Sequence, residues 1–156
     1  MSARPQDDVW QLYPMSEQHL GRVMEIENVA YTHPWTEGIF RDCLRVGYSA
    51  WVITDISGEV LSYALMTMAA GEAHILNLCV APSQQRQGLG GFLLRHLQML
   101  ARAGGAQLML LEVRRSNIAA QRLYEGFGFH RIGVRPGYYP AFDGREDAFV
   151  LSLDLE

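Results

Sequence analysis

The stretch Gln85-Arg86-Gln87-Gly88-Leu89-Gly90 decides the fold, because it lies between an apolar segment that ends at Pro82 and a long helical pattern. Glycines at the start of a helix let a ligand approach the backbone closely. The first N–H groups of a helix have no partner within it, and the helix dipole is positive at that end. These features favour a loop that holds a pyrophosphate. A tight strand-to-helix turn without a ligand would also explain Gly88 and Gly90.

This stretch differs from the two commonest nucleotide-binding motifs. It contains no Gly-Lys-Ser/Thr, so it is not a P-loop. It continues as Gly88-Leu89-Gly90-Gly91-Phe92-Leu93, with no third glycine at the dinucleotide-binding spacing. It also follows a strand in the middle of the chain, which is late for a Rossmann unit. Which phosphate ligand the loop holds therefore depends on the residues around it.

Length and composition predict one domain over residues 1–156, with 49% apolar residues for its core. The net charge of −4 argues against a general nucleic-acid binder and favours a cationic partner. No apolar run reaches transmembrane length, and residues 1–8 do not resemble a signal peptide, so no membrane association is expected. Cys43 and Cys79 have neither metal nor redox spacing. We therefore expect a cytoplasmic protein without a metal.

Hydrophobic periodicity predicts the order β-α-α-β-β-β-α-β-α-β-β. Strands are expected at 9–13, 50–56, 60–69, 73–81, 107–113, 129–134 and 148–155, and helices at 16–31, at 36–46, from the glycine loop to 103, and at 117–127. Ser16 and Thr36 are expected to cap the first two helices. A loop is expected at 135–147. In this order, the earlier strands follow one another directly, as in hairpins, and the later ones are joined through helices, as in crossovers. This predicts an α/β fold with a mixed sheet and helices on both of its faces.

Glu112 is a candidate general base near the end of the strand expected at 107–113. Strand alternation puts it on one face with Leu108 and Leu110. A carboxylate beside apolar neighbours is partly desolvated, which predicts a raised pKa. The alternative is a strand-end glutamate that pairs with Arg114 or Arg115.

Tyr124 and Asn117 are candidates on the helix that follows this strand. Tyr124 lies on the inward stripe of the helix, where it is either a packed tyrosine or a proton donor near a leaving group. Asn117 begins the helix and is either its cap or a ligand contact.

Four stretches together resemble the GNAT acetyltransferases over nearly the whole chain. They are Pro34-Trp35-Thr36-Glu37; Gln85-Arg86-Gln87-Gly88-Leu89-Gly90; Leu111-Glu112-Val113-Arg114 with Ser116-Asn117 and Leu123-Tyr124-Glu125; and Tyr138-Tyr139-Pro140 with Asp143-Gly144-Arg145-Glu146-Asp147-Ala148. The last two narrow the resemblance to the RimI type, the bacterial ribosomal-protein alanine N-acetyltransferases. The resemblance implies the GNAT fold, with a mostly antiparallel central sheet, and acetyl-CoA as co-substrate.

The resemblance also implies a role for each matching position. Glu112 matches the general base and Tyr124 the general acid. Three groups match cofactor-binding positions: the strand residues Leu78, Cys79 and Val80; the phosphate loop Arg86, Gln87, Gly88, Leu89, Gly90 and Gly91; and Asn117. Gly91 departs from the family, which often has arginine there, so one side-chain contact to phosphate is expected to be missing.

The implied chemistry is direct attack of an amine on the thioester. A free α-amine has a pKa of ~8 against ~10.4 for lysine, so one carboxylate suffices to assist it. Tyr124 would protonate the CoA sulfur, and an N–H at Cys79 or Val80 would stabilise the oxyanion. Cys79 has no evident base, so we expect it to pack rather than to act as a nucleophile.

The acceptor is expected to lie between Trp35 and the segment 138–147. Candidate contacts there are Tyr138 and Tyr139, and Asp143, Glu146 or Asp147 is expected to meet a basic side chain of the acceptor. For the acidic residues the alternative is solvated surface, and for the tyrosines it is packing.

The leading interpretation is an N-terminal alanine acetyltransferase, and the resemblance points to ribosomal small-subunit protein eighteen as its protein partner. A second interpretation is a GNAT enzyme for a small amine or an internal lysine. A third, from another class, is a non-catalytic acyl-CoA-binding module. No direct nucleic-acid partner is expected, and a monomer is favoured over an oligomer.

Overall fold

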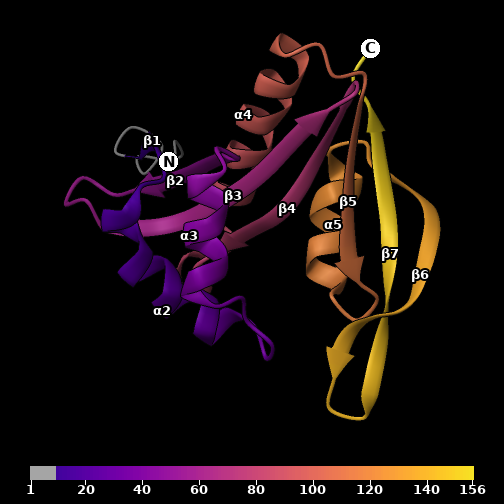
Figure 1. Ribbon diagram of the computed structural model, residues 1–156, viewed down its shortest axis with the longest axis horizontal. Helices are drawn as coiled ribbons and strands as arrows, with labels where there is room; N and C mark the ends of the chain where they lie inside the picture. Colours follow the sequence, from indigo (N-terminus) through magenta and orange to yellow (C-terminus); the bar gives the residue numbers. More distant parts are fainter. Residues whose placement is uncertain (1–9) are drawn as a thin grey trace. The chain divides into compact units, whose positions relative to one another are not determined.

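The computed structural model describes residues 10–156, so the expected strand start at Val9 and residues 1–8 lie outside the described part. Seven strands form one mixed sheet in the order β1-β2-β3-β4-β5-β7-β6. The strands are β1 (Gln11–Pro14), β2 (Ser49–Thr54), β3 (Val60–Ala69), β4 (Glu72–Val80), β5 (Leu108–Arg114), β6 (His130–Ala141) and β7 (Gly144–Asp154). The helices are α2 (Leu20–Ala30), α3 (Glu37–Arg45), α4 (Leu89–Ala103) and α5 (Ile118–Gly126), with short 3-10 turns η1 (Glu17–His19) and η2 (Pro82–Gln84) (Figure 1).

The sheet confirms the expected fold class. β4 pairs with β5 in parallel, whereas β1 with β2, β5 with β7 and β6 with β7 are antiparallel. The order of the elements agrees with the predicted order, and most bounds differ by one to three residues.

The chain divides into two compact units. The first holds Asn77–Leu93 and the described part of Met1–Leu65, and the second holds Met66–Leu76 and Leu94–Glu156. A single domain over residues 1–156 stays a prediction.

The core of the first unit forms around α2, α3 and the strands β2 and β3. Phe40 of α3 is fully buried, and its ring lies edge-on to Tyr63 of β3, with 5.9 Å between ring centroids. The ring of Trp35 is tilted against that of Phe40, with 5.2 Å between ring centroids. Thr36 caps α3, because its side-chain oxygen accepts the Ile39 N–H at 3.3 Å, and this confirms the predicted cap. These contacts fix the end of the α2–α3 loop that leads into α3.

β5 is the central strand of the second unit. It pairs with β4 over Leu108–Leu111 and with β7 along Leu108–Arg114. Its residues alternate as predicted: Met109, Leu111 and Val113 are buried, while Leu108, Leu110, Glu112 and Arg114 on the other face are half-buried.

The expected loop at 135–147 is wrong, because these residues extend β6 and β7 into one long hairpin (Figure 1). Pro136, Gly137 and Pro140 disfavour a central strand, but β6 is the last strand in the sheet order, where proline removes no ladder bond on the open edge. The pairing register shifts between Arg135 and Tyr139, and Gly137 has a φ of 59° there. Because this part of β6 is an irregular edge strand, its apolar and polar residues do not alternate, and the sequence pattern did not indicate a strand.

Candidate active site

The glycine loop has a backbone suited to an anion. Arg86 and Gly88 have φ angles of 68° and 90°, in the left-handed region that a non-glycine residue rarely adopts. Left-handed residues in a turn direct successive N–H groups to one side and form anion-binding nests. α4 begins directly afterwards at Leu89 and is 15 residues long. The loop and the first turn of α4 therefore offer a cradle of backbone donors.

The charges near this loop also fit a phosphate ligand. The sequence contains no aspartate or glutamate between Glu72 and Glu112, whereas it contains Arg86, Arg95 and Arg102 in that interval. The predicted phosphate loop, residues 86–91, lies within this segment without acidic residues, and the side chain of Arg86 is exposed. The residues present therefore fit the pyrophosphate of acetyl-CoA.

The strand β4 carries the other predicted cofactor residues, Leu78, Cys79 and Val80. Its parallel pairing with β5 covers Glu72–Ile75, and the three predicted residues come after this paired stretch. Backbone donors and acceptors at the end of β4 need other partners.

Burial raises the pKa of the Cys79 thiol to about 11. A thiol that stays protonated at neutral pH agrees with the prediction that Cys79 is no nucleophile.

Glu112 lies in a cluster with side chains from β4, which pairs with β5, and from β6, which follows β7 in the sheet order. Its Oε1 is 2.7 Å from Nε2 of His74 on β4. Its Oε2 accepts a hydrogen bond of 3.1 Å from Nε of Arg135 on β6. The Glu112 side chain is only 9% exposed. Both carboxylate oxygens are therefore engaged by basic side chains.

The predicted rise in the pKa of Glu112 is wrong. The hydrogen bond from His74 holds the pKa of Glu112 below its usual range, outweighing burial, and the charge of Arg135 acts in the same direction. The arginine partner also differs from the alternatives considered, because Arg114 pairs with Glu146 and Arg115 with Asp147. Apolar neighbours along β5 indicated desolvation, but the partners that dominate come from strands distant in sequence.

The helix α5 places Tyr124 and Asn117. Tyr124 is 6% exposed, and its ring lies edge-on to Phe129 with 5.6 Å between centroids. Asn117 caps the helix, because its Oδ1 accepts the Ala120 N–H at 3.1 Å. The cap and the packed tyrosine agree with the structural alternatives for both residues, while their roles toward a ligand stay predictions.

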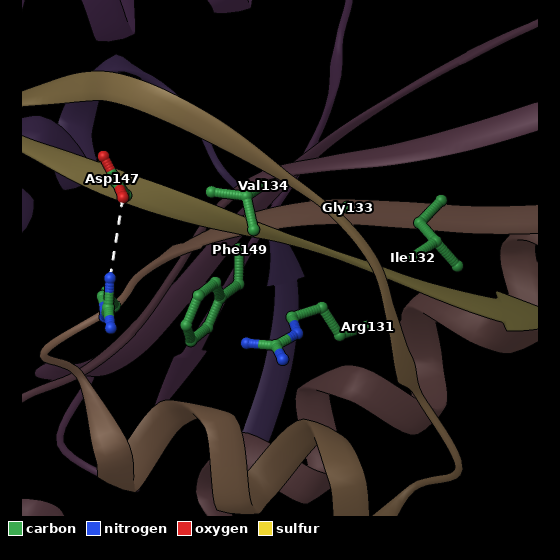
Figure 2. A pocket seen from close by; sticks show the side chains of 7 residues that line it. Arg131, Ile132, Gly133, Val134, Asp147 and Phe149 are labelled. Atoms are coloured by element: carbon green, nitrogen blue, oxygen red, sulfur yellow. Dashed lines mark ion pairs between the residues drawn. The ribbon is translucent and has the colours of Figure 1, made fainter.

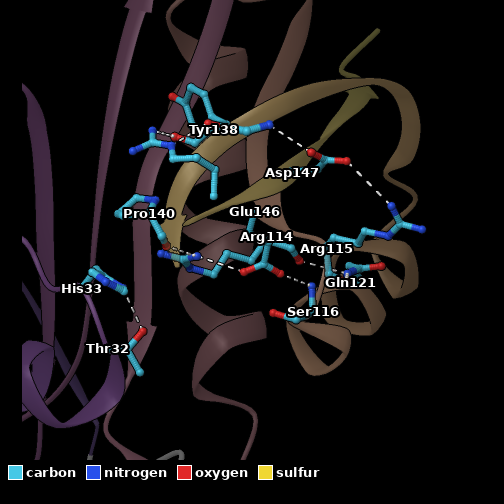
Figure 3. A network of polar contacts seen from close by, with 12 residues as sticks. Thr32, His33, Arg114, Arg115, Ser116, Gln121, Tyr138, Pro140, Glu146 and Asp147 are labelled. Atoms are coloured by element: carbon cyan, nitrogen blue, oxygen red, sulfur yellow. Dashed lines mark hydrogen bonds and ion pairs between the residues drawn. The ribbon is translucent and has the colours of Figure 1, made fainter. Parts of the chain in front are cut away.

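The hairpin of β6 and β7 is held by a polar network (Figure 3). Nη1 of Arg114 donates to Oε1 of Glu146 and to the carbonyl oxygen of Pro140, both at 2.9 Å. Oε2 of Glu146 accepts the Ser116 N–H at 2.8 Å, and these bonds hold the pKa of Glu146 below its usual range. The guanidinium of Arg114 also lies over the ring of Tyr139 at 4.5 Å. Glu146 is thus already paired inside the protein.

The other predicted acceptor residues of the hairpin differ in their surroundings. Tyr138 is exposed and packs edge-on against Tyr139 at 4.9 Å. Tyr139 is half-buried, and burial together with the charge of Glu112 raises its pKa to about 12. Asp143 is exposed in the turn between β6 and β7 and makes no ion pair with any residue in 10–156. Asp147 accepts the Gly137 N–H at 2.9 Å and pairs with Arg115, so of the three predicted carboxylates Asp143 is the one open to an acceptor.

A buried carboxylate that the sequence analysis missed holds Trp35. Glu27 of α2 is 1% exposed, and its Oε2 accepts the backbone N–H of Trp35 at 2.9 Å. Its Oε1 accepts from the Tyr63 hydroxyl at 2.7 Å and from Asn77 at 3.3 Å. Glu27 follows Leu20 and Val23 on the inward stripe of α2. A glutamate at such a core-facing position is the sequence signal that could have predicted a buried, hydrogen-bonded carboxylate.

A surface hollow of about 540 Å³ lies on the second unit. Figure 2 shows Arg131 and Phe149 side by side there, and the guanidinium carbon of Arg131 is 4.3 Å from the Phe149 ring centroid. The lining residues are Arg115, Arg131, Ile132, Gly133, Val134, Asp147 and Phe149. Of the residues predicted to act in catalysis, cofactor binding or acceptor binding, Asp147 of the expected acceptor segment lines it, and the others do not.

Two further features of residues 10–156 bear on the predictions. No helix in this range is long and apolar enough to cross a membrane. No group of three or more histidine, cysteine, aspartate or glutamate side chains in the same range is placed to hold a metal ion.

The chain is similar to known proteins over most of its length. Residues 20–129 match the model of the acetyltransferase (GNAT) family. The ribosomal protein bS18-alanine N-acetyltransferase of Escherichia coli K12 is 39% identical over 130 residues, which cover 83% of this chain and 87% of that protein. The protein of the same name from Haemophilus ducreyi is 36% identical over 140 residues, covering 89% and 96%. The crystal structure of the ribosomal-protein-S18-alanine N-acetyltransferase from Escherichia coli has a TM-score of 0.86 at 35% identity, covering 94% of each chain.

Proposed function

This chain belongs to the acetyltransferase (GNAT) family, and we propose that it acetylates the α-amine of the N-terminal alanine of ribosomal protein bS18. The family makes it an acetyl-CoA-dependent transferase. The identity of 39% over 130 residues to a bS18-alanine N-acetyltransferase carries the choice of acceptor. The reaction would take place in the cytoplasm, where ribosomal proteins are made.

The glycine loop supports the cofactor assignment. Acetyl-CoA carries a pyrophosphate, and the loop combines left-handed backbone at Arg86 and Gly88 with the N-terminus of α4 and no nearby acidic residue in sequence. Arg86, Gln87, Gly88, Leu89, Gly90 and Gly91 would hold the pyrophosphate. The backbone of Leu78, Cys79 and Val80 would hold the pantetheine arm, and Asn117 would contact the cofactor.

We propose that the acetyl group moves in one step of direct attack. The amine nitrogen forms a bond to the thioester carbon, and the carbon–sulfur bond breaks as the tetrahedral intermediate collapses. Tyr124 gives its proton to the leaving thiolate, and the amine loses its proton on the side of Glu112. The high pKa of Cys79 supports this route over an acyl-enzyme.

The amine itself lowers the demand on the protein. With a pKa of ~8, about a tenth of α-amines are neutral at pH 7, against well under a thousandth of lysine amines at ~10.4. An N-terminal acceptor therefore suits a site whose carboxylate, Glu112, has a depressed pKa.

We propose that the acceptor peptide contacts Trp35, Tyr138, Tyr139 and Asp143. Trp35 is fixed through its backbone by Glu27, and the two tyrosines pack on each other. Asp143 supplies an unpaired carboxylate among the described residues for a basic side chain near the acceptor terminus.

The deciding experiment is a comparison of acetyl acceptors. We expect acetylation of the α-amine in a peptide that begins with free Ala-Arg, and none in the same peptide with a blocked N-terminus and internal lysines. Mass spectrometry locates the acetyl group. Transfer to lysine, or a polyamine as the far better substrate, would assign a different acceptor, and acetyl-CoA binding without transfer to any amine would indicate a binding module.

A further inference from the structure

We propose that His74 holds the proton that the acceptor amine loses, with Glu112 orienting its imidazole. The proposal rests on the proposed acetyl transfer and assigns the proton-accepting function to a pair of residues rather than to Glu112 alone. His74 belongs to β4 and Glu112 to β5, and both lie in the same compact unit.

The contact fixes which imidazole nitrogen carries a proton. An ionised carboxylate only accepts hydrogen bonds, so Nε2 of His74 must donate to Oε1 of Glu112 across their 2.7 Å contact. In the neutral imidazole, Nδ1 then carries the lone pair. Within residues 10–156, Nδ1 has no hydrogen-bond partner. It is therefore the atom of the cluster that is free to take a proton.

Accessibility also favours the imidazole over the carboxylate. The His74 side chain is 35% exposed, against 9% for Glu112. Both oxygens of Glu112 are engaged, one by His74 and one by Arg135. A proton that leaves the amine through a water molecule thus reaches Nδ1 of His74 more readily than either carboxylate oxygen.

The proton affinity of the carboxylate points the same way. The pKa of Glu112 lies below its ordinary value of 4.5, so an α-amine with a pKa of ~8 would give it a proton at a disadvantage of more than about 1000-fold. A proton on the imidazole instead creates an ion pair with Glu112, as the aspartate of a Ser-His-Asp triad stabilises its imidazolium.

The other charged groups around His74 and Glu112 do not change the preference for a proton on His74. Arg135 is a permanent cation that is 54% exposed, and Tyr139 stays neutral because its pKa is raised to about 12. Arg114 and Glu146 beside Tyr139 pair with each other. On β4 itself Glu72 is exposed, the Met66–Ala69 end of β3 carries no charge, and Val150 of β7 lies opposite Glu112.

The chemistry balances without any further reactant. The amine nitrogen bonds to the acetyl carbon, the carbon–sulfur bond breaks, and Tyr124 gives a proton to sulfur. Nδ1 of His74 takes the amine proton, and its release to solvent together with reprotonation of Tyr124 restores the enzyme.

The first test uses the free protein and needs no substrate. Nitrogen-15 NMR of the neutral imidazole is expected to show His74 protonated at Nε2 and bare at Nδ1. In Glu112→Gln, the preference for this tautomer should weaken. A neutral His74 protonated at Nδ1 in the wild type would overturn the proposal, whatever the enzyme acetylates.

The second test uses kinetics with the free Ala-Arg peptide. His74→Gln keeps an amide N–H that can bond to Glu112 but cannot accept the proton. We expect kcat at pH 7 to fall at least about tenfold, the KM for acetyl-CoA to change less than about twofold, and the deficit to shrink toward pH 9 as the amine deprotonates unaided. His130→Gln, at an exposed histidine at the start of β6, is the matched control and should keep wild-type kcat.

A role for His74 in structure alone gives the opposite result, because the amide of His74→Gln would restore the hydrogen bond and the wild-type pH profile. Such a profile would overturn the proposal. In the double variant with Glu112→Gln, we expect little further loss beyond the larger single effect, and full additivity would count against a coupled pair. If the wild type acetylates no N-terminal peptide, the proposed function fails, and the tautomer measurement still decides the pair.

Discussion

The hydroxyl of Tyr63 donates a 2.7 Å hydrogen bond to Oε1 of Glu27, and both side chains are almost completely buried. The same carboxylate accepts from the side chain of Asn77 and from the backbone N–H of Trp35. One glutamate on α2 thereby ties together β3, β4 and the loop that carries a proposed acceptor residue.

Removing this carboxylate should cost substantial stability. We expect Glu27→Ala to lower the free energy of unfolding by about 3 kcal/mol, because the buried hydroxyl of Tyr63 and the half-buried amide of Asn77 lose the carboxylate that accepts their hydrogen bonds. Urea unfolding followed by circular dichroism measures the change. Glu25→Ala, at an exposed glutamate that pairs with Arg22, is the control and should stay within about 0.5 kcal/mol of wild type. Equal effects of the two variants would contradict the assigned role of Glu27.

The glycine loop predicts a specific loss of cofactor binding. Gly88→Asp adds a side chain and a negative charge in the proposed pyrophosphate cradle, so we expect the affinity for acetyl-CoA to fall at least about tenfold, or ~1.4 kcal/mol. Isothermal calorimetry on the folded variant measures it. Gly58→Asp is the matched control, because Gly58 has nearly the same φ, 91° against 90°, and open space around it. Both variants carry the backbone strain, and only Gly88→Asp should lose binding; unchanged affinity would remove the loop from the cofactor site.

Much of this loop was predictable from the sequence, whereas the Glu112 cluster was not. Gly88, the strand before it and the apolar helix after it are contiguous, so local periodicity locates them. The partners of Glu112 on β4 and β6 lie 38 and 23 residues away. Neither His74 nor Arg135 carries a local signal of this pairing. The direction of the Glu112 pKa was wrong for that reason: the neighbours along a strand indicate burial, but the neighbours across strands supply the charges.

The hairpin of β6 and β7 shows a second limit of the sequence. Strand alternation identified 129–134 and 148–155, where both strands pair regularly, but the register shift after Arg135 and the prolines beyond it hid the remainder. Thr36 shows the opposite case, because a helix cap depends only on residues within the next turn and was identified correctly.

The depressed pKa of Glu112 predicts a pH dependence of stability. A carboxylate with a lowered pKa in the folded state stabilises the protein above its unfolded pKa, and this contribution is lost as the pH falls through the folded value. We therefore expect the advantage of wild type over Glu112→Gln in urea unfolding to be full at pH 6 and to shrink progressively below about pH 4.5. Other acidic groups titrate in both proteins, so their effect cancels in the difference. A difference that does not vary with pH would contradict the ion-paired state of Glu112.

The catalytic assignment of Tyr124 predicts a loss of turnover without a loss of structure. Tyr124→Phe keeps the ring that packs against Phe129 and removes only the hydroxyl. We expect kcat to fall roughly 100-fold or more, while acetyl-CoA affinity and the melting temperature change little. Steady-state kinetics and calorimetry measure these quantities. Tyr48→Phe, at an exposed tyrosine, is the control. Wild-type turnover in Tyr124→Phe would leave Tyr124 as a packing residue only.

Asp143 and Glu146 of the hairpin should separate in their effects on acceptor recognition. Asp143 is exposed at the turn, whereas both oxygens of Glu146 are engaged by Arg114 and Ser116. We expect Asp143→Ala to lower kcat/KM for the Ala-Arg peptide by about 1–3 kcal/mol in transition-state stabilisation, and to have little effect on a peptide that begins Ala-Glu. Glu146→Ala should instead weaken both peptides alike, because it loosens the hairpin rather than removing a peptide contact. The measurement is kcat/KM of both variants and of the wild type with each of the two peptides. Selectivity for Ala-Arg lost in Glu146→Ala but kept in Asp143→Ala would reverse the assignment and would mean that the acceptor displaces Arg114 from Glu146.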